Sequence, residues 1–259
     1  MGFALTVLTC EAGRTSGYLL DHDGRHVLID CGPGVVDAVQ RHVSLSELQA
    51  VVITHAHADH CLDVVGLAYA LQFPVPREQP LPLYVPAEMT DLLSVLDGQF
   101  GVPTLPALRR PIASSTELHP LELDDNSPIE IVPGLFLTVR PALHAVASAA
   151  LRFSAADGCI AFSSDTGWTD TLLATAEESD LFVCEATYLQ ATPEELTGHG
   201  HLTASQAAQL AHDAGARGLL LTHLSALGDG PQALADARRH YTGVLDLARR
   251  DSRWTIPTS

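Results

Sequence analysis

The stretch Thr54-His55-Ala56-His57-Ala58-Asp59-His60 places three imidazoles and one carboxylate within six residues. It directly follows the apolar run Ala50-Val51-Val52-Ile53, which is bounded by polar residues and therefore predicts a buried strand. In α/β folds, ligand sites lie where strands end and loops begin. Imidazole and carboxylate together suit Zn²⁺ and related transition metals. Asp59 alone could cap the next helix, but this use does not explain three histidines, so the stretch predicts a metal site.

Further along the chain, potential ligands again follow short apolar runs that predict strands. A lone histidine is usually structural, so each of these positions by itself is weak evidence for a metal site. Together with the first motif, however, they raise the number of candidate ligands to seven, which fits two metals with an open position for water better than one closed structural site. The later candidates are His144, Asp165 and His223.

Composition narrows the class of protein. The chain has 259 residues, of which 46% are hydrophobic and 17% charged, as in soluble globular proteins. We expect one domain over residues 1–259. The formal net charge is −17, from 31 acidic and 14 basic residues. A chain of this charge does not attract polyanions through a broad basic field, so nucleic acid could bind only at a local patch or at the metals.

Cysteine usage and hydropathy indicate a cytoplasmic protein. The cysteines are odd in number, widely spaced and without a C-x-x-C pair, which favours a reducing compartment. The first residues carry no basic region, so we expect no signal peptide. No apolar run approaches the roughly 18 residues that a membrane span needs. The cysteines are Cys10, Cys31, Cys61, Cys159 and Cys184.

Hydrophobic periodicity predicts two βα halves, packed sheet to sheet with helices outside. Strands are expected at 3–9, 18–21, 26–30, 50–53 and 81–85 in the first half, and at 118–123, 129–132, 135–140, 149–153, 159–163, 180–184 and 218–222 in the second. Helices are expected at 35–42, 61–72, 87–97, 203–214 and 231–241, with Thr203 as an N-cap.

Three segments predict connections rather than regular elements. Residues 11–17 predict a loop, and Asp23-Gly24 predicts a hairpin turn. Residues 98–115 are irregular and rich in Gly and Pro, and two interpretations stay open: a loop over the site, or a surface connection. Within that segment, Arg109-Arg110 either grips an anionic substrate or is a solvated pair.

The H-x-H-x-D-H motif at 55–60, followed by the later ligands, resembles the metallo-β-lactamase fold of hydrolases over essentially the whole chain. The resemblance implies an α/β fold, a four-layer αββα sandwich with two metals at one edge of its sheets. We expect two Zn²⁺, with Mn²⁺ as an alternative. The resemblance assigns His55, His57 and His144 to one metal, Asp59, His60 and His223 to the second, and Asp165 as the bridge between them.

Single positions separate the branches of this superfamily. The di-iron oxygen-reducing branch has a carboxylate where this chain has His57, which favours zinc hydrolysis here. True β-lactamases lack an acid at the position of Asp165 and are normally exported. Glyoxalase II-like enzymes add a helical glutathione-binding region, and the 36 residues after His223 are too few for it.

Two further motifs resemble the ribonuclease Z-like branch. Cys184-Glu185-Ala186-Thr187 resembles its Glu-Ala-Thr motif, and Gly200-His201-Leu202-Thr203 resembles its Gly-His-Ser-Thr motif, with Leu202 as a departure. In that family the histidine of the second motif lies near the scissile phosphate, supported by a glutamate. This implies catalytic roles for His201 and Glu185. The alternatives are a helix-capping His201 and a buried Glu185 bonded to backbone. His199 ranks below His201 because it lies outside the motif.

One departure concerns the substrate. Ribonuclease Z enzymes that mature tRNA carry a long Gly/Pro-rich arm between the third histidine ligand and the bridging aspartate. Here His144 and Asp165 are 21 positions apart, so we expect no arm and no tRNA substrate. The expected partner is a small or cyclic phosphodiester, and a homodimer stays open.

The resulting hypothesis is a dinuclear zinc phosphodiesterase in which the metals activate the attacking water. Asp59 would hold or deprotonate that water, and His201, oriented by Glu185, would stabilise charge or protonate the leaving oxygen. A lactonase or thioesterase on the same metals is the alternative. The third possibility is a metal-binding or cofactor-carrier protein without enzymatic activity. The complete set of expected ligands disfavours it.

Overall fold

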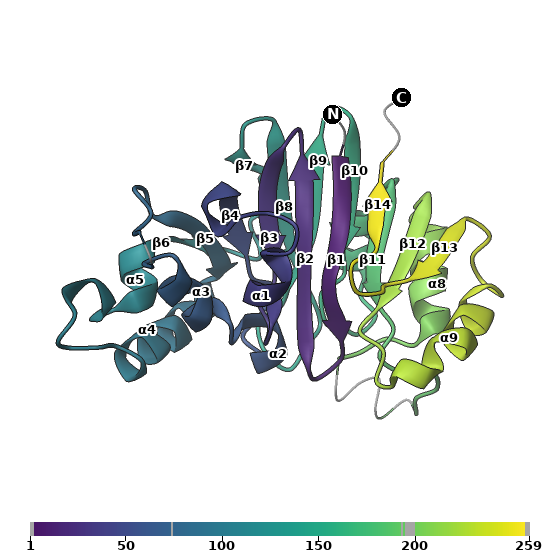
Figure 1. Ribbon diagram of the computed structural model, residues 1–259. Helices are drawn as coiled ribbons and strands as arrows, with labels where there is room; N and C mark the ends of the chain where they lie inside the picture. The colour runs from purple at the N-terminus through teal and green to yellow at the C-terminus, as the bar shows by residue number, and fades with distance from the viewer. Residues whose placement is uncertain (1–2, 74, 193, 195–199, 257–259) are drawn as a thin grey trace.

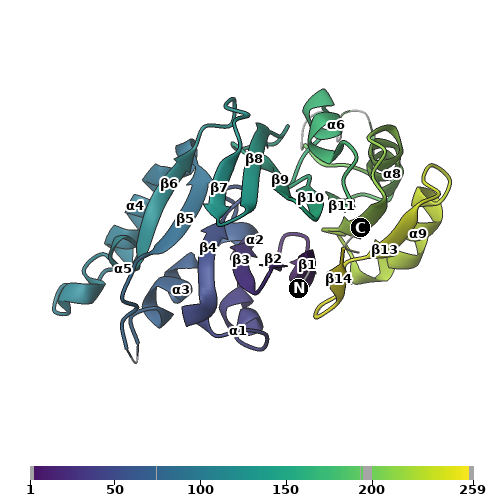
Figure 2. The same cartoon turned by 90° about the horizontal axis from the view of Figure 1, so that it is seen from above.

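The fold consists of two mixed sheets that pack face to face with helices on both outer faces (Figures 1 and 2). It was described from a computed structural model that covers residues 3–73, 75–192, 194 and 200–256. Each sheet has seven strands in this described part of the chain. The arrangement confirms the predicted four-layer αββα sandwich.

The first sheet has the strand order β14-β1-β2-β3-β4-β5-β6. Its strands are β1 (Phe3–Glu11), β2 (Thr15–His22), β3 (Arg25–Ile29), β4 (Leu48–Val52), β5 (Leu81–Pro86), β6 (Thr116–Leu121) and β14 (Arg253–Thr255). The helices of this half are α1 (Val35–Val39), α2 (Ala58–Cys61), α3 (Val64–Ala70), α4 (Thr90–Gln99) and α5 (Pro111–Ser115).

The second sheet has the strand order β13-β12-β11-β10-β9-β8-β7. Its strands are β7 (Ile129–Val132), β8 (Leu135–Pro141), β9 (Ala149–Ala155), β10 (Gly158–Phe162), β11 (Leu181–Glu185), β12 (Gly218–Thr222) and β13 (Val244–Leu247). The helices of this half are α6 (Asp170–Ala176), α8 (Ala204–Asp213) and α9 (Gly230–Ala237).

Three apolar clusters hold the four layers together. The central cluster lies between the sheets and contains Leu20 and Val27 from the first sheet with Leu151 and Phe162 from the second. The other two clusters lie between each sheet and the helices on its outer face. Successive residues of a strand point to opposite faces. The near-continuous apolar runs of the inner strands therefore supply both an inter-sheet core and a helix-facing core.

Local signals in the sequence account for several of these elements. Asp23 and Gly24 have positive φ angles of 52° and 76°, as the expected two-residue hairpin turn requires. Thr203 caps α8 as expected, since its Oγ1 accepts a hydrogen bond from the Gln206 amide at 3.2 Å. Gln206 Oε1 in turn accepts from the Thr203 amide at 2.9 Å, which completes a capping box.

The structure corrects four expectations about the elements. Residues 11–17 form the end of one strand, a short turn and the start of the next, rather than a loop. The strand expected at 118–123 is β6, which pairs with β5 and so belongs to the first sheet. The helix expected at 61–72 starts earlier and breaks at Asp63, whose amide donates to the Cys31 carbonyl at 2.9 Å instead of to a carbonyl of the helix. Neither α6 nor the short edge strands β13 and β14 were expected.

The segment 98–115 does not lie over the candidate site. It contains a 3₁₀ turn, Pro106–Leu108, and α5, and it lies with α4 at one end of the molecule (Figure 1). Arg110 Nε donates to the buried Asp97 carboxylate at 3.2 Å, and Arg109 Nε donates to the Pro103 carbonyl at 3.2 Å. These arginines hold their own segment together, so the interpretation as a surface connection is correct.

The parallel strands of both sheets end at one common edge of the sandwich. β3, β4 and β5 run parallel in the first sheet, and β10, β11 and β12 run parallel in the second. Non-glycine residues with positive φ angles lie one or two residues after three of these strand ends, namely Asp30 at 57°, Ser164 at 56° and His223 at 58°. Such backbone strain persists where the surroundings enforce it, often at functional sites. In the described residues, no helix has the length and apolar character of a membrane span.

Candidate metal centre

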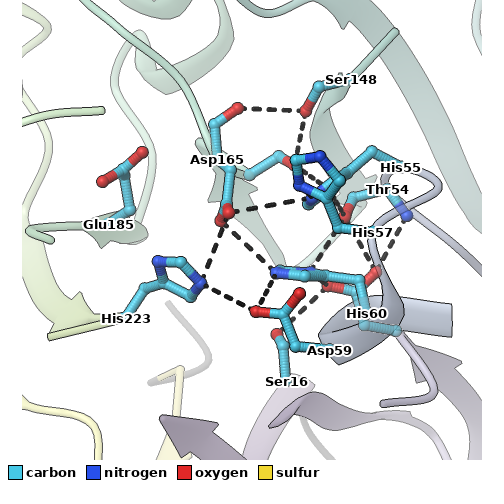
Figure 3. Close-up of polar contacts among 12 residues, drawn as sticks. Ser16, Thr54, His55, His57, Asp59, His60, Ser148, Asp165, Glu185 and His223 are labelled. Carbon is cyan, nitrogen blue, oxygen red and sulfur yellow. Dashed lines mark hydrogen bonds and ion pairs between the residues drawn. The ribbon is translucent and has the colours of Figure 1, made fainter. Parts of the chain in front are cut away.

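All seven candidate ligands meet at this edge of the sandwich, and all of them except His144 are labelled in Figure 3. The connection from β4 into α2 contributes the ligands of the first motif, and the loops after β8, β10 and β12 contribute the later ones. The seven candidates fall into two groups, within each of which all ligand atoms lie within 4.8 Å of one another. These two groups are His55, His57, His144 and Asp165, and Asp59, His60 and His223. A third such group in the described residues joins His201 to Asp165 and His223.

Three imidazoles of the first group converge on one point. His57 Nδ1 lies 3.2 Å from His55 Nε2 and 3.1 Å from His144 Nε2. With Zn–N distances of about 2.1 Å, the nitrogens of a tetrahedral site lie roughly 3.4 Å apart, so the spacing fits a zinc ion. Burial lowers the pKa of His55 well below its usual range and also lowers the pKa of His144. Both rings are therefore neutral near pH 7, which is the form that binds metals.

The second group contains two buried ring nitrogens that lack a hydrogen-bond partner, Nε2 of His60 and Nε2 of His223. Asp59 Oδ2 lies 3.7 Å from the first and 3.5 Å from the second, which is too far for a good hydrogen bond. Leaving such nitrogens unpaired is costly in a buried site. A cation between them and Asp59 would satisfy all three residues, so this donor set also fits a metal ion.

Asp165 lies between the two groups. Its Oδ1 is 3.5 Å from His60 Nε2, and its Oδ2 is 3.4 Å from His223 Nε2 and 3.7 Å from His55 Nε2. Burial by itself raises the pKa of Asp165, but the surrounding imidazoles outweigh burial and hold that pKa well below its usual range. The carboxylate is therefore ionised and faces both groups, as a bridging ligand must.

Most of the candidate histidine ligands have a second polar contact, made by the other nitrogen of the ring. Where a histidine binds metal through one ring nitrogen, the other nitrogen usually bonds to a carboxylate, a carbonyl or another polar group, which sets the tautomer and the ring orientation. Four of the five histidines have such a contact at Nδ1. The contacts are His60 to Asp30 Oδ2 at 2.6 Å, His223 to Thr187 Oγ1 at 3.0 Å, His144 to the Gly200 carbonyl at 3.0 Å, and His55 to Thr54 Oγ1 at 3.0 Å.

Asp30 is the main site residue to which sequence reasoning gave no role. It accepts hydrogen bonds from the Thr54 amide and hydroxyl, both at 2.9 Å, and from Ser16 Oγ at 3.2 Å. Burial lowers the pKa of His60, but the carboxylates of Asp30 and Asp165 outweigh it and raise that pKa well above its usual value. The same carboxylates favour any positive charge at this ring. The sequence does contain a signal for a role of Asp30 at the site, because this residue follows an apolar strand just as the later candidate ligands do.

Glu185 and His201 form a pair beside the two groups. Glu185 Oε1 lies 2.9 Å from His201 Nδ1 and accepts from the Thr166 amide at 2.7 Å, while its Oε2 accepts from the Leu202 amide at 3.2 Å. Glu185 is therefore both a buried carboxylate bonded to backbone and the partner of His201. The cap of α8 is Thr203, which leaves His201 without a capping role.

His201 faces the candidate ligands. Its ring centroid lies 5.0 Å from that of His144 and 5.7 Å from that of His223. Burial lowers the pKa of His201, but the hydrogen bond and the charge of Glu185 outweigh burial, so the pKa is raised above its usual value. A proton on this ring is therefore favoured at the edge of the candidate metal centre.

The sequence also singled out His199, the pair Arg109-Arg110 and the five cysteines. His199 lies outside the described residues. Arg109 and Arg110 make the local contacts given above and do not reach the ligands. The five cysteines are free thiols.

The chain resembles known proteins along nearly its full length. The model of the β-lactamase superfamily domain matches residues 25–224. The probable metallo-hydrolase YhfI of Bacillus subtilis is 26% identical over 259 residues, covering 96% of this chain and 98% of the relative. The crystal structure of YhfI matches with a TM-score of 0.85 at 24% identity, covering 98% of this chain and 100% of that chain.

Two further matches represent other members. A ribonuclease Z of Streptomyces coelicolor is 29% identical over 283 residues, covering 93% of this chain and 92% of the relative. The crystal structure of a diphosphatase from the PhnP family matches with a TM-score of 0.75 at 19% identity, covering 99% of this chain and 98% of that chain.

Proposed function

Because this chain belongs to the β-lactamase superfamily and resembles its metallo-hydrolases, we propose that it is a dinuclear zinc phosphodiesterase acting on small or cyclic phosphodiesters. The observation that carries the proposal is the Glu185–His201 pair, which lies beside two convergent ligand groups. A metal site alone serves many hydrolytic reactions, whereas a positioned histidine beside it serves a reaction that needs a proton at the leaving group.

The donor set determines which metal fits. Five imidazoles with carboxylates favour zinc over the oxygen-loving Mg²⁺ and Ca²⁺, and Mn²⁺ is the alternative. His55, His57 and His144 would hold one ion, Asp59, His60 and His223 the other, and Asp165 would contact both. When bound, two zinc ions supply Lewis acidity, which lowers the pKa of water to about 7 and neutralises charge on a phosphoryl group.

The residues of the chain supply the remaining steps. Glu185 accepts the Nδ1 proton of His201, so that Nε2 is the nitrogen left for the substrate. The negative charge of Glu185 stabilises the imidazolium form, which protonates the departing oxygen or offsets charge on the phosphoryl group. Asp59 holds the attacking water through its carboxylate and takes up a proton from it. Its pKa is lowered because the nearby imidazoles of His223 and His60 outweigh burial, which keeps it ionised.

Phosphate ester chemistry recurs among the matches, since relatives of this chain include proteins named ribonuclease Z and a structural neighbour is a PhnP-family diphosphatase. Two observations favour a small substrate over tRNA. The chain between His144 and Asp165 is occupied by the hairpin of β9 and β10, which leaves no room for an added arm. The formal net charge of −17 also opposes binding of a long polyanion.

The test compares ester classes on the zinc-loaded protein. We expect hydrolysis of bis(p-nitrophenyl) phosphate and little turnover of a lactone and thioester series. His201→Ala should lower kcat by roughly 10²–10⁴ and leave the metal content intact. His60→Ala should instead lose metal, as measured by elemental analysis. His212→Ala, which changes an exposed histidine on α8, is the control. Turnover confined to lactones or thioesters, or an unchanged kcat in His201→Ala, would contradict the proposal.

A further inference from the structure

A cleft lies directly beside the candidate metal centre and shares His223 with it. We propose that this cleft is a subsite for a second phosphate group of the substrate, carried by the same molecule as the scissile phosphodiester. The inference rests on the proposed function, because it names the substrate class of that site. Arg249 and Arg250 would bind the second phosphate.

The cleft has the size and position of a subsite. Its volume is about 350 Å³, within the range of about 300–1,000 Å³ that is common for small-ligand sites. It is bounded by the last residues of β1, by the segment Leu221–Leu224 at the end of β12, by the first residue of α9 and by Leu247–Arg250 after β13. These elements converge at the lower right of Figure 1, at the edge of the sandwich that also carries the ligands. The proposal places a substrate that is bound at the metals so that it extends past His223 into the cleft.

The charge of the cleft differs from that of the chain as a whole. The sequence has 31 acidic and 14 basic residues, yet two consecutive arginines line this one cleft. The acidic residue of its wall is Glu11, whose Oε2 already lies 3.3 Å from an Arg14 guanidinium nitrogen. A second carboxylate, Asp246, contacts Arg249 from outside the wall.

Both arginines keep donors for a ligand. Arg250 Nη2 lies 3.9 Å from Glu11 Oε1, and Arg249 Nη2 lies 3.5 Å from Asp246 Oδ1. Both distances exceed those of good hydrogen bonds, and the side chains of Arg249 and Arg250 are 66% and 55% exposed. A guanidinium offers five N–H donors in a planar fork that matches phosphate oxygens in pairs. A phosphate would therefore gain charge-assisted hydrogen bonds that the present carboxylates do not provide.

The kinetic test uses two substrates that differ by one phosphate. They are thymidine 5′-(p-nitrophenyl phosphate) and the same ester carrying a 3′-phosphate. With the zinc-loaded protein, we expect the 3′-phosphate to lower KM about tenfold with little change in kcat, a factor that corresponds to about 1.4 kcal/mol of binding. The variant R249Q/R250Q should lose this difference and hydrolyse the ester without the 3′-phosphate normally.

The control variant R239Q/R253Q removes the same charge outside the cleft. Arg239 pairs with Asp236 on α9 and Arg253 pairs with Asp21 on β2, so neither lines the cleft. This variant should keep the tenfold preference. Equal KM values for the two esters in the unmodified protein, or a preference that survives in R249Q/R250Q, would overturn the subsite.

A binding measurement separates the subsite from the reaction. Calorimetry with zinc-loaded protein should show thymidine 3′,5′-bisphosphate binding about tenfold more tightly than thymidine 5′-phosphate, and R249Q/R250Q should abolish the difference. If neither ester is hydrolysed but the bisphosphate preference depends on the arginines, the phosphodiesterase proposal fails and the subsite stands. If both esters are hydrolysed and the bisphosphate shows no preference, the subsite fails and the phosphodiesterase proposal stands.

Discussion

The hydroxyl oxygens of Tyr18 and Thr222 lie 2.6 Å apart, although the two residues are 204 positions apart in the sequence. Tyr18 belongs to β2 of the first sheet, and Thr222 ends β12 of the second, immediately before His223. Burial raises the pKa of Tyr18 far above its usual value, so the phenol stays protonated and hydrogen-bonded. The contact joins the two sheets directly beneath the candidate ligands. Both side chains also border a small cavity of about 20 Å³, which is enough for roughly one water molecule.

Removing this inter-sheet contact should lower stability. In Tyr18→Phe, Thr222 Oγ1 loses its buried partner, and we expect the free energy of unfolding to fall by about 1–2 kcal/mol in urea titrations. Thr222→Ser keeps the hydroxyl and should retain the contact, whereas Thr222→Val should resemble Tyr18→Phe. The two losses should not add in the double variant Tyr18→Phe/Thr222→Val, because both remove one interaction. Additive losses would show that the contact contributes nothing as a pair.

Asp30 should control metal affinity through His60. In Asp30→Asn the amide has no negative charge with which to orient His60 through its Nδ1. We expect a zinc affinity about 10–100-fold lower, measured by competition with a chelator. Asp23→Asn, at the exposed hairpin turn, is the matched control and should keep the affinity of the unmodified protein. Equal affinities in the two variants would remove Asp30 from the support of the site.

Gly200 should tolerate no side chain, for two separable reasons. Its φ angle is +64°, and a Cβ atom there would lie 2.4 Å from the Leu143 carbonyl oxygen and 2.8 Å from the His144 Cα. Gly215 has a φ angle of +67° but no atom within 4 Å of such a Cβ. Gly215→Ala should therefore show only the backbone penalty, of about 1–2 kcal/mol.

Gly200→Ala should lose more stability than Gly215→Ala and should also displace His144 and His201. We expect lower zinc affinity and lower kcat for Gly200→Ala only. The measurements are unfolding titrations, chelator competition and phosphodiester hydrolysis on the two variants side by side. Equal stabilities and activities would mean that the close approach to His144 has no consequence.

Zinc should stabilise the fold. A ligand that binds only the folded state adds about 4 kcal/mol at a free concentration near 1,000 times Kd. For a chain of this size that corresponds to a rise in Tm of roughly 8–16 °C. Removal of the metal with a chelator should lower the Tm by this amount, and added zinc should restore it. His60→Ala should show a much smaller zinc-dependent shift. An identical Tm with and without zinc would contradict a metal centre built from these ligands.

Much of the fold was predictable because its signals are local. The strands that deliver the ligands are short apolar runs with polar ends, and the hairpin turn at Asp23-Gly24 and the cap at Thr203 are also local signals. The pairing of the strands was not predictable from such local signals. β6 follows the first half in sequence, but only the hydrogen bonds to β5 decide to which sheet it belongs. β14 consists of three residues, Arg253–Thr255, and has strand character only because β1 lies beside it.

A metal centre is indicated by features that are readable in the sequence, namely the residue types, the H-x-H-x-D-H spacing at 55–60 and the strand-end positions of the later candidates. The surroundings of these candidates became visible only in the folded chain. In the fold, Asp30 contacts His60 and Tyr18 contacts Thr222. Arg249 and Arg250 line a cleft that shares His223 with the candidate metal centre. A hydrogen bond or a cleft needs groups within a few ångströms in space, and these groups come from segments that lie far apart in the sequence.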